Sequence, residues 1–190
     1  MSAVAGPVVL VARHAPVAVS GVCYGQIDVP TKLDEHAAAR ALLREIAKGG
    51  WTIDRIWSSP WARTRLPAAR VAERLGVPHS IDARVSEISF GAWEGRRYTD
   101  LERDPAFMPW MNDWRRARPP GGEVLGELVA RVRAWRREVE GSGENALAVT
   151  HAGVIRALRA DVGSREMNPS EAVEPLSIER VQASGEMLTP

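Results

Sequence analysis

The chain has 190 residues, with 25 basic against 24 acidic side chains and a formal charge of +1 at pH 7. This length favours a single domain over 1–190, and the balanced charge excludes a strongly basic nucleic-acid-binding or membrane-binding protein. The lone cysteine, Cys23, excludes an internal disulfide and a multi-cysteine metal site. Because the sequence shows neither a secretory signal nor a spanning segment, we predict a cytoplasmic protein.

The predicted elements begin with the apolar run 8–12, which is typical of a short strand buried on both faces of a parallel sheet. A loop rich in proline and glycine follows it. Apolar residues at helical spacing then predict a helix over 33–48, which a glycine pair ends. Residues 53–57 are predicted to form the second strand.

The helix after the second strand is predicted to have Ser59 as its cap and Pro60 as its first residue. Pro67 further along predicts a kink or a late helix start, because proline lacks the amide hydrogen that an α-helix uses. An edge strand is predicted over 81–85. Residues 86–122, rich in tryptophan, proline and arginine, are predicted to form an irregular cap segment.

The rest of the chain alternates between helices and strands. Helices are predicted near 105–116, over 123–139 and over 153–161, and strands over 146–150 and 175–181. This alternation predicts an α/β fold, a three-layer α/β/α sandwich with a mostly parallel central sheet.

Polar residues follow three of the predicted strands at their carboxyl ends. Arg13 and His14 come directly after the first strand, residues 58–63 after the second, and His151 after 146–150. Ligands of open α/β sheets bind in the crevice beyond these strand ends. Arginines and helix amides bind phosphoryl oxygens, and an imidazole can attack phosphorus. The placement therefore favours a catalytic site for a phosphorylated ligand.

Each of these features also has a simpler structural explanation. An Arg-His pair is common, His151 could be a satisfied histidine at a strand end, and Arg63 could pair with a helix carboxylate. Other arginines stand at helical spacing and are predicted to lie on solvated helix faces: Arg65, Arg70, Arg74, Arg131, Arg133, Arg136 and Arg137. Only the joint placement of the candidate residues favours catalysis.

Four motifs occur along the chain: VARH at 11–14, SSPWAR at 58–63, EISFGAWEG at 87–95 and VTHAG at 149–153. In order and spacing they resemble the histidine phosphatase superfamily, which includes the cofactor-dependent phosphoglycerate mutases. The resemblance covers about residues 8–160 and implies a phosphoglycerate mutase-like fold. Within the superfamily, WMNDW at 110–114 with the following Pro119 and GGE looks most like the alpha-ribazole phosphatases of cobalamin biosynthesis.

The resemblance implies a role for each residue that matches a family motif. His14 would be the nucleophile that becomes phosphohistidine, and Arg13 and Arg63 would clamp the phosphoryl oxygens. His151 would hydrogen-bond the same group and stabilise its transition-state charge. Glu87 would donate a proton to the leaving oxygen, and it could later accept one from water.

Two other carboxylates compete with Glu87 for the proton-transfer role. In the family the position of Glu94 belongs to structure rather than to proton transfer. Glu123 fits a charge that is favourable at the start of a helix.

The chain departs from the family's pattern directly after His14, where Ala15, Pro16 and Val17 replace Gly-Glu-Thr. Ala15 restricts the backbone more than glycine would, and Pro16 removes an amide donor. The following loop is shorter than the common form. Ser20 stands roughly where an asparagine would help to hold phosphate, so Ser20 is included as a phosphate-binding residue by its position alone.

We predict a metal-independent phosphomonoester hydrolase that acts through phosphohistidine on a small phosphorylated metabolite, with alpha-ribazole 5'-phosphate as a candidate. No metal is expected, because His14 and His151 have no second ligand at metal spacing, and no cofactor is expected. Phosphatase is favoured over mutase because the long insertions of the true mutases are missing. Phosphoglycerate mutase-type phosphoryl transfer and non-catalytic binding of a phosphorylated ligand stay open as alternatives.

The partners expected from the sequence are few. A small phosphorylated metabolite is the expected ligand, nucleic acid and membrane are not expected, and a homodimer is left open. Trp93, Trp110 and Trp114 lie in the predicted cap, where they could stack on an aromatic leaving group or simply pack the cap.

Overall fold

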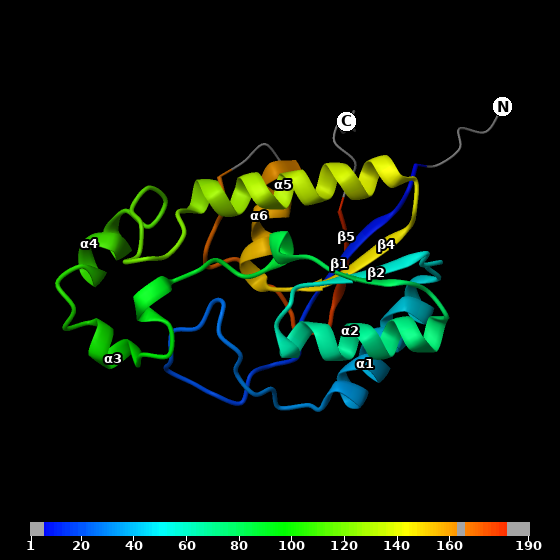
Figure 1. Cartoon of the computed structure of the whole chain (residues 1–190), viewed down its shortest axis with the longest axis horizontal. Coiled ribbons are helices and arrows are strands. Elements are labelled where there is room, and N and C mark those ends of the chain that lie inside the picture. The colour runs from blue at the N-terminus through cyan, green and yellow to red at the C-terminus, as the bar shows by residue number, and fades with distance from the viewer. Residues whose placement is uncertain (1–5, 163–165, 182–190) are drawn as a thin grey trace.

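The computed structural model describes residues 6–162 and 166–181, which form a central sheet with helices on both faces (Figure 1). The strands are β1 (Val9–Arg13), β2 (Arg55–Ser58), β3 (His79–Ile81), β4 (Ala146–Thr150) and β5 (Ile178–Val181). Their order across the sheet is β3-β2-β4-β1-β5, and only β5 runs antiparallel to its neighbour. The predicted three-layer sandwich with a mostly parallel sheet is confirmed.

Four of the six α-helices in the described ranges cover the two faces of the sheet in pairs (Figure 1). The six are α1 (Glu35–Gly49), α2 (Ala62–Leu75), α3 (Tyr98–Leu101), α4 (Phe107–Asn112), α5 (Leu125–Ser142) and α6 (Ala152–Val162). In Figure 1, α5 and α6 lie over one face and α1 and α2 over the other, while α3 and α4 lie beyond the sheet. None of the helices in the described ranges is long and apolar enough to cross a membrane.

The side chains of β1 alternate between the two helical layers. Val9 and Val11 belong to the hydrophobic cluster formed with α5 and α6, whereas Leu10 and Ala12 belong to the cluster formed with α1 and α2. All four are 3% exposed or less. A strand in the middle of a parallel sheet needs apolar residues on both faces, which explains the continuous apolar run.

The strand register brings three strand ends to the same edge of the sheet. β1 pairs in parallel with β4 so that Arg13 lies opposite Thr150, and β2 pairs in parallel with β4 so that Ser58 lies opposite Val149. The His14 amide continues the ladder and donates to the Thr150 carbonyl at 3.0 Å. The residues that follow β1, β2 and β4 therefore start from neighbouring points.

The predicted edge strand over 81–85 is wrong in its position. The strand is β3, which ends at Ile81, and Ala83–Val85 form a 3-10 turn instead. The Asp82 carboxylate causes the turn, because it accepts the Arg84 amide at 2.8 Å and also binds the Arg84 guanidinium. Local side-chain bonding of this kind competes with strand pairing.

The predicted start of the second helix is also wrong. Ser59 does not cap α2, which begins at Ala62 with Trp61 in the N-cap position. The Ser59 hydroxyl bonds the Thr64 hydroxyl at 2.7 Å instead. The predicted late start is wrong as well, because α2 begins well before Pro67 and continues through it; a proline near a helix start removes only one intrahelical bond.

The cap segment has a small hydrophobic cluster of its own. It contains the predicted short helix as α4, and a second short helix, α3, that the sequence pattern did not predict. The buried members of the cluster come from the cap and from the loop after β1: Cys23, Trp93, Leu101 and Phe107, with Phe90 and Trp110 packed against them. Trp93 is thus a packing residue of the cap, at 1% exposed.

Two arginines of α5 do not lie on a solvated face as predicted. Arg136 is 2% exposed and pairs with Glu140 at 2.7 Å and with Asp161 at 3.2 Å. Arg131 is largely buried, and its guanidinium donates to the carbonyls of Arg84 and Ser86, where the cap segment begins. Arg133 and Arg137 are exposed, as predicted.

Candidate functional site

The two histidines at the strand ends lie side by side. His14 follows β1 and His151 follows β4, and their ring centroids are 5.2 Å apart. Both are buried, at 3% and 0% exposed. The parallel register of β1 and β4 therefore carries two residues that are 137 positions apart in sequence into one site.

The hydrogen bond of His14 determines which of its nitrogens can react. Nδ1 lies 2.7 Å from the carbonyl oxygen of Ala15, and because a carbonyl only accepts, Nδ1 carries the hydrogen. In the neutral ring Nε2 then bears the lone pair. The pKa of His14 is lowered from 6.5 to about 4, mainly by burial; the charges of Arg63 and Arg13 act in the same direction, and the hydrogen bond to Ala15 opposes them. His14 is therefore neutral near pH 7, with Nε2 available as a nucleophile.

His151 is held by a chain of two buried hydroxyls. Its Nε2 lies 2.8 Å from the Ser59 hydroxyl, which lies 2.7 Å from the Thr64 hydroxyl. Each hydroxyl can donate or accept, so this chain is compatible with a hydrogen on either ring nitrogen of His151. Burial lowers the pKa of His151 well below 6.5, and the Arg63 charge acts in the same direction. Sequence reasoning missed this role because it placed Ser59 in a helix cap.

Arg63 lies in the first turn of α2, and its side chain reaches the loop after β1. Its Nη1 and Nη2 donate to the carbonyls of Ile27 and Gly25, each at 2.6 Å, and Nη1 lies 3.7 Å from the Asp28 carboxylate. Burial lowers the pKa of Arg63, with the charges of Asp28 and Glu87 opposing it. The two carbonyl bonds orient the guanidinium without neutralising its charge.

Three buried nitrogens of the cluster have no hydrogen-bond partner among the described residues. They are Nε of Arg13, Nε of Arg63 and Nδ1 of His151. The Arg13 guanidinium is otherwise held by its Nη1, which donates to the Val173 carbonyl at 2.9 Å. A buried polar atom without a partner is costly, and each of these nitrogens can donate a hydrogen to an anion.

Glu87 reaches the cluster from the start of the cap segment. One carboxylate oxygen accepts the Gly153 amide at 3.1 Å, at the start of α6, and the other accepts the Ile88 amide at 2.9 Å. A Cβ on residue 153 would clash with the Glu87 carboxylate, so glycine is needed for this close approach. Arg13, His14, Arg63, Glu87 and His151 thus share one region of the structure.

The remaining predicted residues lie outside this cluster. Ser20 is exposed, and neither of the two cavities that border the cluster has it in its lining, so its phosphate-binding role stays a prediction. Glu94 accepts the amides of Gln26 at 2.9 Å and Phe90 at 2.8 Å, which fits the expected structural role. Glu123 pairs with Arg131 at 2.7 Å.

A cavity of about 480 Å³ opens beside Arg13 and Glu87. Its polar lining also includes Arg156 of α6, which the sequence pattern did not single out. The aromatic side chains that line it are Tyr24, Phe90, Tyr98, Trp110 and Trp114. Cavities of this size hold drug-sized ligands, and aromatic walls favour a flat apolar one.

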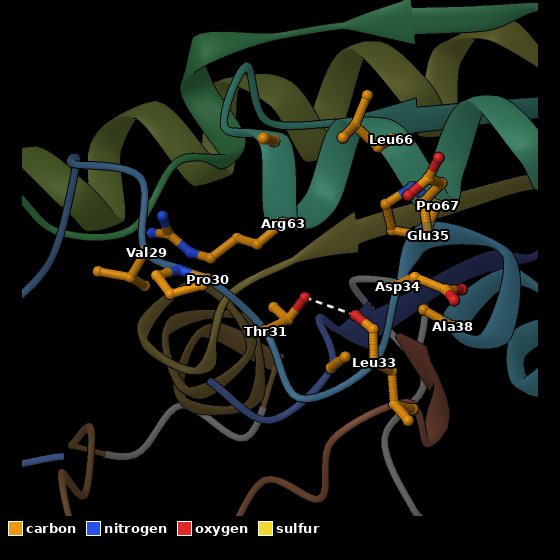
Figure 2. A pocket seen from close by; sticks show the side chains of 12 residues that line it. Val29, Pro30, Thr31, Leu33, Asp34, Glu35, Ala38, Arg63, Leu66 and Pro67 are labelled. Carbon is orange, nitrogen blue, oxygen red and sulfur yellow. Dashed lines mark hydrogen bonds between the residues drawn. The ribbon is translucent and has the colours of Figure 1, made fainter. Parts of the chain in front are cut away.

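A second cavity, of about 340 Å³, borders Ala15 and Arg63 (Figure 2). Its walls are the loop over 29–33, the start of α1 and the first residues of α2. Figure 2 shows the Thr31 hydroxyl donating to the Leu33 carbonyl at 2.7 Å within this wall. The lining is mainly aliphatic, and Glu87 and the aromatic residues of the larger cavity are not part of it. The larger cavity is therefore the better place for a leaving group.

The buried neutral histidines predict a stability that falls in acid. Between pH 6.5 and about 4 the unfolded chain binds a proton at His14 that the folded chain does not, so the unfolding free energy falls as the pH falls. For His14 alone the loss across this window is about 3 kcal/mol. Urea unfolding across the same pH range measures the loss. His14→Gln should show a smaller loss, and the exposed control His36→Gln the wild-type loss; equal losses in all three proteins would contradict a buried neutral His14.

The family model described as the histidine phosphatase superfamily (branch 1) matches residues 9–186. The adenosylcobalamin/alpha-ribazole phosphatase of Salmonella typhimurium is 32% identical over 135 residues, 69% of this chain and 67% of that protein. Phosphoserine phosphatase 1 of Hydrogenobacter thermophilus is 29% identical over 124 residues, 63% of this chain and 58% of that protein. The crystal structure of the alpha-ribazole phosphatase from Shigella flexneri has a TM-score of 0.72 and 25% identity, covering 84% of this chain and 81% of that one. Similar proteins thus include phosphatases named for different substrates.

Proposed function

The chain belongs to the histidine phosphatase superfamily (branch 1), and we propose that it is a metal-independent phosphomonoester hydrolase that acts through a phosphohistidine at His14. The observation that carries this proposal is the pairing of two buried imidazoles, 5.2 Å apart, within one set of unpartnered nitrogens. Such a set suits a tetrahedral anion. The free Nε2 of His14 supplies the nucleophile.

In the first half-reaction Nε2 of His14 attacks phosphorus, and the bond between phosphorus and the leaving oxygen breaks. The protonated carboxyl group of Glu87 gives its proton to that oxygen. Arg13 and Arg63 hold the phosphoryl oxygens through charge-assisted hydrogen bonds, and His151 donates from Nδ1. The products are the dephosphorylated alcohol and the phosphoenzyme.

In the second half-reaction water attacks phosphorus and the bond to Nε2 of His14 breaks. The Glu87 carboxylate, ionised by the first step, takes the proton of the water. Inorganic phosphate leaves, His14 returns to the neutral ring, and Glu87 is again protonated. Two displacements at one phosphorus give overall retention of configuration.

For the substrate we propose a phosphate ester with a flat, nucleoside-like leaving group, such as alpha-ribazole 5'-phosphate. The support is the cavity of about 480 Å³ beside Glu87, in which Trp110 and Trp114 form part of an aromatic wall. Phosphoserine is small and zwitterionic, and it would leave most of this wall uncovered. A 5'-phosphate is also an alkyl ester, whose poor leaving group needs the proton that Glu87 supplies.

A comparison of alpha-ribazole 5'-phosphate with phosphoserine tests the substrate. We expect a higher kcat/KM for alpha-ribazole 5'-phosphate, measured as released inorganic phosphate. Trp114→Leu should lower kcat/KM for alpha-ribazole 5'-phosphate by about 2- to 10-fold, the usual contribution of an aromatic contact. It should leave kcat/KM for phosphoserine unchanged. A preference for phosphoserine, or an equal effect of Trp114→Leu on both substrates, would rule the aromatic wall out as the source of specificity.

Removal of divalent metal ions should leave the activity unchanged, because the guanidinium groups of Arg13 and Arg63 supply the positive charge that the mechanism needs. The check is the rate with an aryl phosphate before and after EDTA treatment, with a metal-dependent phosphatase as the positive control for chelation. A loss of rate that added zinc or magnesium restores would contradict the proposal.

The two alternatives predict other outcomes. A phosphoglycerate mutase would transfer the phosphoryl group between 3-phosphoglycerate positions in the presence of the bisphosphate, faster than it releases inorganic phosphate. A non-catalytic binder would bind phosphate esters without any release. We also propose that the hydrolase is cytoplasmic and that its ligand is a small molecule. Nucleic-acid and membrane partners are not proposed, and a homodimer is left open.

A further inference from the structure

Arg131 of α5 uses its guanidinium to hold the segment that carries Glu87. Nη1 donates to the carbonyls of Arg84 and Ser86, both at 2.7 Å, and Nη2 donates to the carbonyl of Glu87 itself at 3.0 Å. Three carbonyls within four successive residues thus converge on one side chain. A guanidinium can do this because its donors are fixed in one plane.

Glu123 holds the other edge of the same guanidinium. Its two carboxylate oxygens accept from Nε of Arg131 at 2.7 Å and from Nη2 at 2.8 Å. Both side chains are largely buried, at 18% and 14% exposed. The Glu123 amide also donates to the Ser89 carbonyl at 2.9 Å. All five N–H groups of Arg131 are therefore used, and the pair is anchored to the backbone on both sides of Glu87.

These contacts fix the backbone from which the Glu87 side chain extends. Its carbonyl accepts from Arg131 and also from the Gln26 amide group at 2.9 Å, and its carboxylate is met by the Gly153 amide. Arg131 itself is absent from the lining of the cavity beside Glu87. Any effect of Arg131 on the reaction must therefore pass through another residue.

We propose that Arg131, oriented by Glu123, is the positioning residue for proton transfer by Glu87, and that it acts through the backbone of residues 84–87. This inference rests on the proposed function, because it gives Glu87 the role of proton donor. The geometry matters more than the charge of Arg131. A lysine at 131 keeps the charge but lacks the planar fork, so it cannot hold three carbonyls and a carboxylate from one position.

The test compares Arg131→Lys with the wild type on two substrates. One is an alkyl phosphate, whose leaving group needs a proton, and the other is p-nitrophenyl phosphate, whose leaving group does not. We expect kcat for the alkyl phosphate to fall by about 10- to 100-fold, the lower part of the range for general acid catalysis, because a misplaced acid keeps part of its effect. For p-nitrophenyl phosphate kcat should fall less than about 3-fold. KM for both should change little, because Arg131 does not line the cavity.

The double variant Arg131→Lys with Glu87→Gln separates positioning from general damage. If Arg131 acts through Glu87, the double variant should be no slower on the alkyl phosphate than Glu87→Gln alone. Additive losses would overturn the inference. Glu123→Gln should reproduce the substrate-dependent loss of Arg131→Lys in weaker form, because one oxygen of the pair remains an acceptor.

Arg137→Lys is the matched control, since Arg137 lies on the exposed side of the same helix. It should match the wild type on both substrates. Equal losses on both substrates in Arg131→Lys, or no loss on either, would overturn the inference. If Arg131→Lys does not fold, as judged from its thermal melt, Glu123→Gln is tested in its place. Equal losses on both substrates, or no loss on either, would then overturn the inference. A failure of the proposed function looks different: Glu87→Gln would itself show no dependence on the leaving group.

Discussion

His14→Ala is expected to reduce phosphatase activity to the limit of detection, a loss on the order of 10⁶-fold, as for removal of the nucleophile in other covalent enzymes. The reason is the free Nε2, which the bond from Nδ1 to Ala15 leaves with its lone pair in the cluster. In the proposed mechanism His151 does not replace it, because its Nε2 is bonded to Ser59 and its Nδ1 donates a hydrogen to the phosphoryl group. The rate of phosphate release from an aryl phosphate measures the loss.

The matched control for His14→Ala is His36→Ala, which removes an exposed imidazole of α1. It should keep the wild-type rate. His14→Ala should still bind inorganic phosphate, because Arg13, Arg63 and His151 remain. Residual turnover of more than about 1% of the wild-type rate in His14→Ala would show that water attacks directly, and the phosphohistidine mechanism would then be abandoned.

Glu87→Gln is expected to separate substrates by their leaving groups. With an alkyl phosphate kcat should fall by about 10²- to 10⁴-fold, the usual contribution of a general acid. With p-nitrophenyl phosphate the first step needs no proton, and only the weaker activation of water in the second step should slow the reaction. Glutamine keeps an acceptor for the Gly153 amide, so the site should keep its shape.

A plot of log kcat against the leaving-group pKa for a series of phosphate esters makes this measurement quantitative. The slope should be steeper for Glu87→Gln than for the wild type. The control is Glu94→Gln, because Glu94 holds the amides of Gln26 and Phe90 and does not line the larger cavity. Parallel slopes for the wild type and Glu87→Gln would assign proton donation to another group.

The sequence allowed the central pair of the site to be predicted because parallel strands obey a strong topological rule. Short apolar runs before His14 and before His151 predict buried strands, and the carboxyl ends of parallel neighbours meet at one edge. The prediction assumed that these strands are parallel neighbours, and the observed pairing of β1 with β4 confirms this. The resemblance to a family then added Glu87, which has no recognisable signal of its own in a segment without regular structure.

Ser59 shows where local rules fail. A serine before a proline is a common helix start, so the sequence favours a cap, but the hydroxyl bonds His151, 92 positions away. The Ser59 hydroxyl is used in this buried bond to a ring nitrogen instead of capping the helix. Trp61 takes the N-cap position without a side-chain hydrogen bond. Contacts across such a distance leave no pattern in a single sequence.

Arg131 and Arg136 were misread for a related reason. Arginines at helical spacing favour a solvated face, but Leu128, Val132 and Trp135 form the buried stripe of α5, and both arginines stand next to it. The position of both arginines beside this apolar stripe was the sequence signal for their burial. Besides Glu123, the partners of Arg131 are three backbone carbonyls, which every residue has, so no sequence pattern could identify them.

The most direct test of the account is the identity of the phosphorylated atom. The enzyme would be mixed rapidly with substrate, quenched in alkali to preserve phosphohistidine, digested, and analysed by mass spectrometry and phosphorus NMR. We expect a single phosphoryl group on the peptide that contains His14, attached to Nε2, because Nδ1 is bonded to Ala15. A phosphoryl group on His151, on Nδ1 of His14, or on no histidine at all during turnover would contradict the account.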